Sequence, residues 1–186
     1  MINVDDARGA LRTVSGAEAV ADFGVIDEGR SGRADCRVSA GIESWQGMYR
    51  LWIQVTHRKG GAGSKTSVVK WPYSDTSPKD LDRVIADLRF IENVTAPGSL
   101  PDERGWFARL FDRITGTVHL GEYRLQSPLD DAQRYGGKVV ARILRWRDQP
   151  EVSLTEGRQS GVIVIAQLPH RACAVLRRTL ADFAPE

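Results

Sequence analysis

Polar and apolar residues alternate along two neighbouring stretches of the chain, residues 34–43 and residues 48–56. A period of two is typical of a strand that buries one of its faces. The glycine-rich, basic segment 59–65 separates the second stretch from a further β-prone run at residues 66–71, as in a hairpin. The pattern therefore predicts three strands that pair in sequence as an antiparallel meander.

Three later stretches have the apolar spacing of helices. Ser77 precedes Pro78, which suits a helix N-cap and a first helical residue, and apolar residues then recur at helical spacing over residues 81–91. Residues 102–115 and 169–183 carry similar stripes. We expect the first of these helices to cover the apolar face of the meander.

Residues 1–29 also carry apolar residues at helical spacing, and Ser15 stands three residues before Glu18, as in a capping box. We therefore predict two short helices in this segment. Its net charge is negative. We interpret it as a cap that packs on the rest of the chain, and the alternative is that it shields a basic surface.

The second half of the chain repeats the plan of the first. Strand patterns occur at residues 117–125, 138–147 and 161–167, and a helix pattern follows them. When the halves are aligned by this order, residues 49–59 correspond to residues 139–148. The repeat is one of pattern, because few residues are identical.

The predicted fold class is α+β, with antiparallel strand meanders that are each closed by a helix and duplicated as β-β-β-α twice. With 186 residues and 41% hydrophobic content, the chain can bury a core. The predicted organisation is an N-terminal helical cap (1–29), a first sheet-plus-helix repeat (30–94), a linker and helix (95–116) and a second sheet-plus-helix repeat (117–186).

Basic residues are concentrated on particular strands, although the net charge of the chain is only +2. From Gly47 to Tyr73 there are five Lys or Arg and no Asp or Glu, and residues 138–147 also lack acids. Phosphates attract these cations and unpaired bases stack on tryptophan, so the composition favours a nucleic-acid interface. The candidate nucleic-acid-binding residues are Arg50, Trp52, Arg58, Lys59, Lys65, Lys70, Trp71, Lys138, Arg142, Arg145, Trp146, Arg147 and Arg158. The alternative is that the charges only solvate a sheet face and that the tryptophans pack in a core.

Other chemistries have weaker support in the sequence. Residues 60–66 approach a phosphate-binding loop, but Ser64 stands where glycine should precede lysine, and a strand pattern follows where a helix should begin. The three histidines lack metal-ligand spacing. A Cys–His pair stays open, although Cys36 and Cys173 lie on apolar faces, where thiols are usually inert. We therefore expect no enzyme activity, no metal and no cofactor.

The cysteine count and the hydropathy bear on the compartment. Two cysteines make neither a disulfide framework nor a metal knuckle, which agrees with a reducing environment. No apolar run approaches the roughly 20 residues that cross a bilayer, and residues 1–6 lack the regions of a signal peptide. We expect a cytoplasmic protein without a membrane partner.

The order of strands and helix, together with the basic hairpin, resembles the Whirly and transcriptional-coactivator type of single-stranded nucleic-acid-binding fold. Residues 48–88 and 138–183 carry the resemblance. It implies binding of single-stranded DNA or RNA through sheet and hairpin residues. The alternative function is a protein-interaction module, such as an adaptor, an inhibitor or an immunity-type protein, that binds an acidic partner. Both interpretations leave homo-oligomerisation open.

Overall fold

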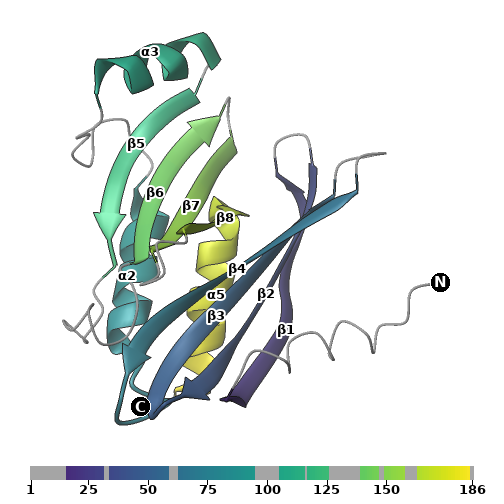
Figure 1. The fold of residues 1–186 in the computed structure, drawn as a ribbon, viewed down its shortest axis with the longest axis vertical. Helices are drawn as coiled ribbons and strands as arrows, with labels where there is room; N and C mark the ends of the chain where they lie inside the picture. Colours follow the sequence, from purple (N-terminus) through teal and green to yellow (C-terminus); the bar gives the residue numbers. More distant parts are fainter. Residues whose placement is uncertain are drawn as a thin grey trace.

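The computed structural model describes residues 16–31, 34–58, 63–94, 105–115, 117–125, 139–146, 149–157 and 163–184. In chain order, its elements are β1 (Ala17–Ser31), β2 (Ala34–Trp45), β3 (Met48–Arg58), β4 (Ser64–Ser74), α2 (Asp82–Asn93), α3 (Trp106–Thr115), β5 (Thr117–Arg124), β6 (Val139–Trp146), β7 (Gln149–Gly157), β8 (Ile163–Pro169) and α5 (His170–Phe183). Figure 1 shows their arrangement.

The strands form two antiparallel sheets of four strands each, in the orders β1-β2-β3-β4 (sheet one) and β5-β6-β7-β8 (sheet two). α2 is the first helix after sheet one, and α5 directly follows sheet two. The fold is therefore α+β with antiparallel sheets, as predicted. The predicted count of three strands in each half is wrong, because each sheet has four.

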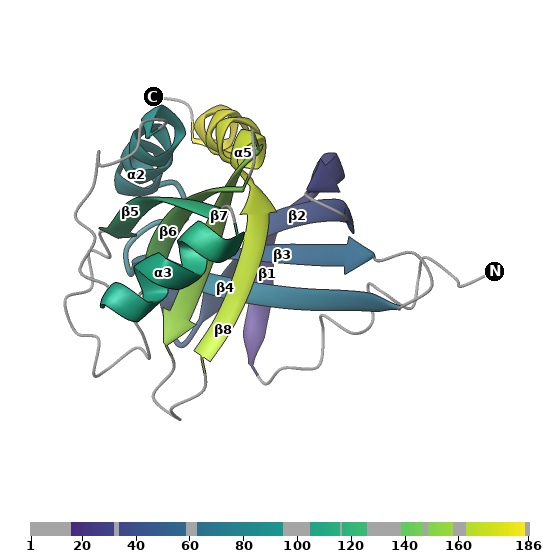
Figure 2. The ribbon, with the colours of Figure 1, turned by 90° about the horizontal axis from the view of Figure 1, so that it is seen from above.

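One hydrophobic core joins the two sheets. Leu51 and Trp71 of sheet one and Leu154 and Leu168 of sheet two are almost fully buried in the same cluster. The strands of sheet two cross those of sheet one, and α2 and α5 lie side by side along one side of the crossed sheets (Figure 2). The two halves thus bury their apolar surfaces together, which is the main force that stabilises a fold.

Hydrogen bonds also join the sheets. A carboxylate oxygen of Glu156 on β7 accepts the backbone N–H of Lys70 on β4 at 2.8 Å. The Nε2 of His57 on β3 donates to the carbonyl oxygen of Gln167 on β8 at 2.7 Å. Glu156 is buried, so its carboxylate is a specific polar link between the sheets and not a solvated charge.

Polar contacts also join α2 to α5. The Nε of Arg177 on α5 donates to Glu92 on α2 at 2.8 Å, and this hydrogen bond holds the pKa of the Glu92 carboxyl below its ordinary value. The buried His170 donates its Nε2 proton to the carbonyl oxygen of Ile91 at 2.9 Å. The same carbonyl, in the last turn of α2, also accepts the N–H of Val94 at 3.2 Å, so His170 adds a second bond that links α5 to the end of α2.

The predicted N-terminal helices are wrong for the residues that the structure describes. β1 covers Ala17–Ser31 and pairs with β2, and the register shifts by one extra β1 residue at three places. Each bulge displaces the alternation by one residue, so the strand loses its period of two in the sequence. Residues 1–15 of the predicted cap lie outside the described residues.

α2 begins later than predicted. Its first residue is Asp82 and its N-cap is Leu81. Ser77 instead forms a turn, in which its hydroxyl accepts the amide N–H of Lys79 at 3.2 Å and its carbonyl accepts that of Asp80 at 3.3 Å. The serine–proline pair therefore specifies a turn before the helix, while the apolar stripe of the helix is buried as predicted.

β7 is a strand that the sequence pattern does not reveal. Val152 and Leu154 mark its buried face, and Glu156 takes the next position on that face. A carboxylate at a core-facing position interrupts the hydrophobic alternation, and its partner Lys70 is 86 residues away in the chain. A long-range contact of this kind leaves no local signal.

The extra strand changes the correspondence between the halves. β3 is third in its sheet, whereas β6 is second in its own. The predicted match of residues 49–59 with residues 139–148 is therefore wrong, because the third strand of sheet two is β7. The two basic strands do not occupy equivalent places.

A buried polar pair joins α2 to sheet two. The hydroxyl of Tyr123 on β5 donates to Oδ1 of Asp87 at 2.8 Å, and the Tyr123 ring packs on Phe90 with centroids 4.5 Å apart. Asp87 is buried, and a buried carboxylate needs hydrogen-bond donors because it has lost water.

Replacing Tyr123 by Phe keeps the ring contact and removes one donor from the buried carboxylate of Asp87. We expect the free energy of unfolding, measured by urea denaturation, to fall by about 1–2 kcal/mol. An unchanged denaturation midpoint would mean that the hydroxyl does not stabilise Asp87.

Candidate functional site

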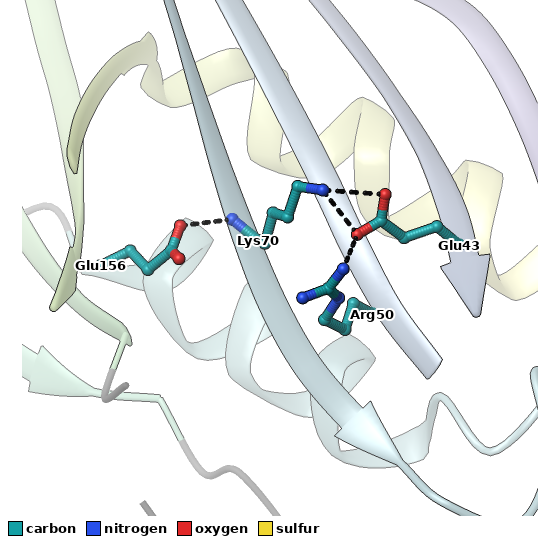
Figure 3. Close-up of polar contacts among 4 residues, drawn as sticks. All are labelled: Glu43, Arg50, Lys70 and Glu156. Carbon is teal, nitrogen blue, oxygen red and sulfur yellow. Dashed lines mark hydrogen bonds and ion pairs between the residues drawn. The ribbon is translucent and has the colours of Figure 1, made fainter. Parts of the chain in front are cut away.

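Two of the candidate cations lie on β3 and β4, toward the β2–β3 turn, and converge on one carboxylate. Successive residues of a strand point to opposite faces, so Glu43, Arg50 and Lys70 share the face opposite Leu51 and Trp71. We call this the outer face of sheet one. Glu43 is 2.5 Å from Arg50 and 2.8 Å from the Nζ of Lys70. Figure 3 shows both cations directed at the Glu43 carboxylate.

This ionic cluster is largely closed to solvent. The side chains of Arg50 and Glu43 are each only 12% exposed, and the Arg50 guanidinium also lies 4.4 Å from the centre of the Trp45 ring. Where the dielectric constant is low, one carboxylate attracts two neighbouring cations strongly. Arg50 and Lys70 are therefore engaged within the sheet, and this site is a structural ion cluster before it is a surface for phosphate.

The two tryptophans of the first basic strand pair belong to the interior. Trp71 lies on the inner face and is 1% exposed, while Trp52 lies on the outer face and is 8% exposed. Neither indole presents an open face on which a base could stack. Both tryptophans therefore pack in the interior, which agrees with the alternative interpretation and not with the hypothesis that bases stack on them.

Trp52 lies against the strand beside it because that strand has a glycine there. A Cβ built on Gly41 would come within 2.5 Å of both the Trp52 ring and the carbonyl oxygen of Ala21. Such a distance is not tolerated between real atoms, so only glycine leaves room for the indole across β2. The polar-looking outer face is thus closely packed at its centre.

The remaining described candidates of sheet one, Arg58 and Lys65, lie at the end of the sheet where β1 and β3 finish and β2 and β4 begin. We call this the hairpin end, and we define it by the exposed basic residues Arg30, Arg37, Arg58 and Lys65. On the outer face it is hollowed by a groove of about 300 Å³. The groove is lined by Glu28, Gly29, Arg30, Asp35, Cys36, Arg37, Thr56 and Arg58.

Charges at the hairpin end are weakly paired compared with the Glu43 cluster. Arg37 and Glu28 approach to 3.4 Å, but their side chains are 50% and 63% exposed, so water screens the attraction. Arg58 lies opposite Asp35 in the register of β2 and β3. The guanidinium groups at this end are accessible and can bind an anion from solution.

For the basic residues of sheet two, the structure gives the strand and the register. Arg142, Arg145 and Trp146 belong to β6, and the register sets Arg142 opposite Glu122 of β5. Lys59, Lys138, Arg147 and Arg158 lie outside the described residues.

Sequence reasoning missed Glu43, although the hairpin register contained the signal. Gln46 and Gly47 both have positive φ angles, 51° and 77°, as in the two-residue turn that joins tightly paired strands. Such a turn makes Trp45 face Met48, and counting outward then sets Glu43 opposite Arg50. The sequence does not mark Arg30 as part of a site, because the pattern of β1 does not identify it as a strand. Arg37 lies on β2, which the pattern does predict, but only the register with β1 and β3 places it beside Arg30 and Arg58.

The described residues contain no group of three or more His, Cys, Asp or Glu that could hold a metal ion. Cys36 and Cys173 are free and buried, and burial raises the pKa of the Cys173 thiol to about 12. A thiol of this kind stays protonated and is a poor nucleophile. None of the described helices has the length and apolar character needed to span a bilayer.

Comparison with known proteins adds no family assignment. No protein-family model, curated protein or solved structure matches the chain.

Replacing Gly41 by Ala should lower the free energy of unfolding by about 1–3 kcal/mol, because the added methyl overlaps the Trp52 ring and a backbone oxygen. The tryptophan fluorescence maximum should shift to the red as the indole is displaced. Gly105→Ala is the matched control, since a methyl there meets nothing within 4 Å. Equal stabilities of the two variants in urea would contradict the packing role of Gly41.

Both cysteines should be inert in the native protein. A colorimetric thiol reagent added to the folded chain at pH 8 should report almost no reaction, because both thiols are buried and the Cys173 thiol is protonated. In denaturant, both should react fully. Rapid reaction of either thiol in the folded chain would contradict this expectation and revive a nucleophilic role.

Proposed function

We propose that the chain binds single-stranded nucleic acid at the hairpin end of sheet one. The observation that carries the proposal is the groove of about 300 Å³ on the outer face, which the exposed Arg30, Arg37 and Arg58 line. Lys65 is exposed at the same end of the sheet, but it pairs with His57 and lies on the other face. Arginine presents a planar fork of donors that matches two phosphate oxygens. A groove with several such side chains suits successive phosphates of one strand.

The chemistry of the groove favours contacts with the backbone of the nucleic acid over recognition of bases. Its lining combines guanidinium groups with the hydroxyl of Thr56, and these donors serve phosphate and sugar oxygens. The nearest tryptophan of the predicted set on β3, Trp52, is buried. The proposed binding is therefore weakly dependent on base sequence and strongly dependent on salt.

The order of elements supports a relation of the whole fold to the Whirly and transcriptional-coactivator type. In both halves, four antiparallel strands precede the helix that packs in the shared core, α2 or α5. On this proposal the chain is an internal duplication of one sheet-plus-helix unit. α3 is an addition to that plan.

The second candidate function is a protein-interaction module for an acidic partner. The observation that favours it is the mixed charge of the groove, in which Glu28 and Asp35 alternate with the arginines. Protein interfaces commonly match charges of both signs, whereas a phosphate backbone is uniformly negative.

Salt dependence separates these functions. We expect a fluorescently labelled oligothymidylate to bind the full chain in anisotropy titrations, with a log affinity that falls linearly with log salt concentration. Arg37→Ala and Arg58→Ala should each weaken binding and reduce the slope by about 0.7, the value for one lost phosphate contact on a single strand.

Arg89→Ala is the matched control, because it removes one exposed charge from α2, away from the hairpin end. It should leave the slope unchanged. Circular dichroism confirms that each variant is folded. No binding by the wild type at low salt would end the nucleic-acid proposal and favour the acidic protein partner. Equal slopes for Arg58→Ala and Arg89→Ala would move the site away from the hairpin end.

A further inference from the structure

α3 carries an apolar face that no described part of the chain covers. Its main neighbour is β5, which follows it directly. The stripe predicted from the sequence is present, but its side chains are between 43% and 75% exposed. The residues of this patch, which we call the α3 face, are Trp106, Phe107, Leu110, Phe111 and Ile114.

The α3 face has the dimensions of a covered surface. At about 100° per residue, its five positions span an arc of roughly 140°, as wide as the stripe of a helix that faces a core. The helix has only 10 residues, and a helix of that length has little stability of its own in water. Packing of the apolar face against a partner is the usual source of the missing stability.

We propose that a second copy of this chain covers the α3 face, so that the protein forms a dimer through paired α3 helices. The five exposed side chains present roughly 600 Å² of apolar surface. Two such faces buried against each other remove roughly 1,200 Å² from water, which reaches the size of a specific stable interface. An apolar patch of this size is at the upper end of what a monomer exposes, and such patches often mark an interaction site.

The charges around α3 favour a second copy over a lipid surface or an acidic protein. Residues 102–115 contain three acids and three arginines, so the segment has no excess of positive charge to attract anionic headgroups or carboxylates. A two-fold interface is self-complementary, so a segment whose sequence has equal numbers of both charges suits pairing with its own copy. The interface is separate from the hairpin end and does not depend on nucleic-acid binding.

The test is the mass of the full chain in solution, measured by light scattering after size exclusion at high micromolar concentration. We expect twice 20.6 kDa for the wild type and 20.6 kDa for the double variant Phe107→Glu, Ile114→Glu, because the added carboxylates repel across the interface. Val25→Glu is the matched control, since it changes an exposed apolar residue of β1 to the same acid and should stay dimeric.

A monomeric wild type overturns the proposal, and so does a dimer that survives the double variant. If the monomeric wild type instead floats with phosphatidylcholine vesicles, a lipid surface is the occupant.

A cross-linking readout keeps the test independent of any loss of folding by the double variant. Leu110 is at the middle of α3, so in a two-fold pairing the new thiol of Leu110→Cys lies near the same thiol of the second copy. Mild oxidation should link this variant into a dimer, while Val25→Cys should stay unlinked. Both native thiols are buried, so the wild type should not cross-link and serves as the negative control. Equal linking of the two variants would overturn the proposal.

Discussion

Burial of two apolar sheet faces against one another is the constraint on which the rest of the structure depends. Sheet one and sheet two each have one apolar face, and these faces share a core with α2 and α5. The inner faces are therefore closed to any partner. β3 and β4 have 11 residues each and, at about 3.3 Å per residue, extend beyond the strands of sheet two that cross them (Figure 2). The hairpin end is the part that extends.

The same geometry separates two kinds of charge on the outer face. Toward the β2–β3 turn, Glu43 pairs with both Arg50 and Lys70 where solvent is scarce, and a cation without a partner there would be costly. At the hairpin end, water surrounds Arg37 and Glu28 and their attraction is weak. Basic residues of similar appearance in the sequence thus differ in role, because position along the strand decides whether they face a buried carboxylate or solvent.

Local pattern was sufficient for much of the fold. The alternation of β2 and β3, the hairpin to β4 and the apolar stripes of α2 and α5 each depend on neighbours within a few residues, which a sequence displays directly. β1 and β7 depend on something else. Bulges in β1 disrupt its period, and the buried Glu156 of β7 is explained only by a donor on a distant strand.

The candidate site was predicted in part for the same reason. Arg58 and Lys65 flank a hairpin that the glycines predict, and both residues are exposed in the structure. The burial of Trp52 required knowledge of Gly41 on the neighbouring strand, and that of Trp71 required the core shared with sheet two. Amphipathic residues such as tryptophan suit either an interface or a core, so their type alone does not decide between the two.

The bond from Lys70 to Glu156 has a consequence for behaviour at high concentration. β4 is an outer strand of its sheet, and such a strand offers unpaired N–H and C=O groups to any extended chain. Here a carboxylate of β7 occupies one of those donors at 2.8 Å, and β7 and β8 stand against the same strand. An incoming peptide cannot add to the sheet at that position, so the crossing of the two sheets also protects the molecule from aggregation by edge pairing.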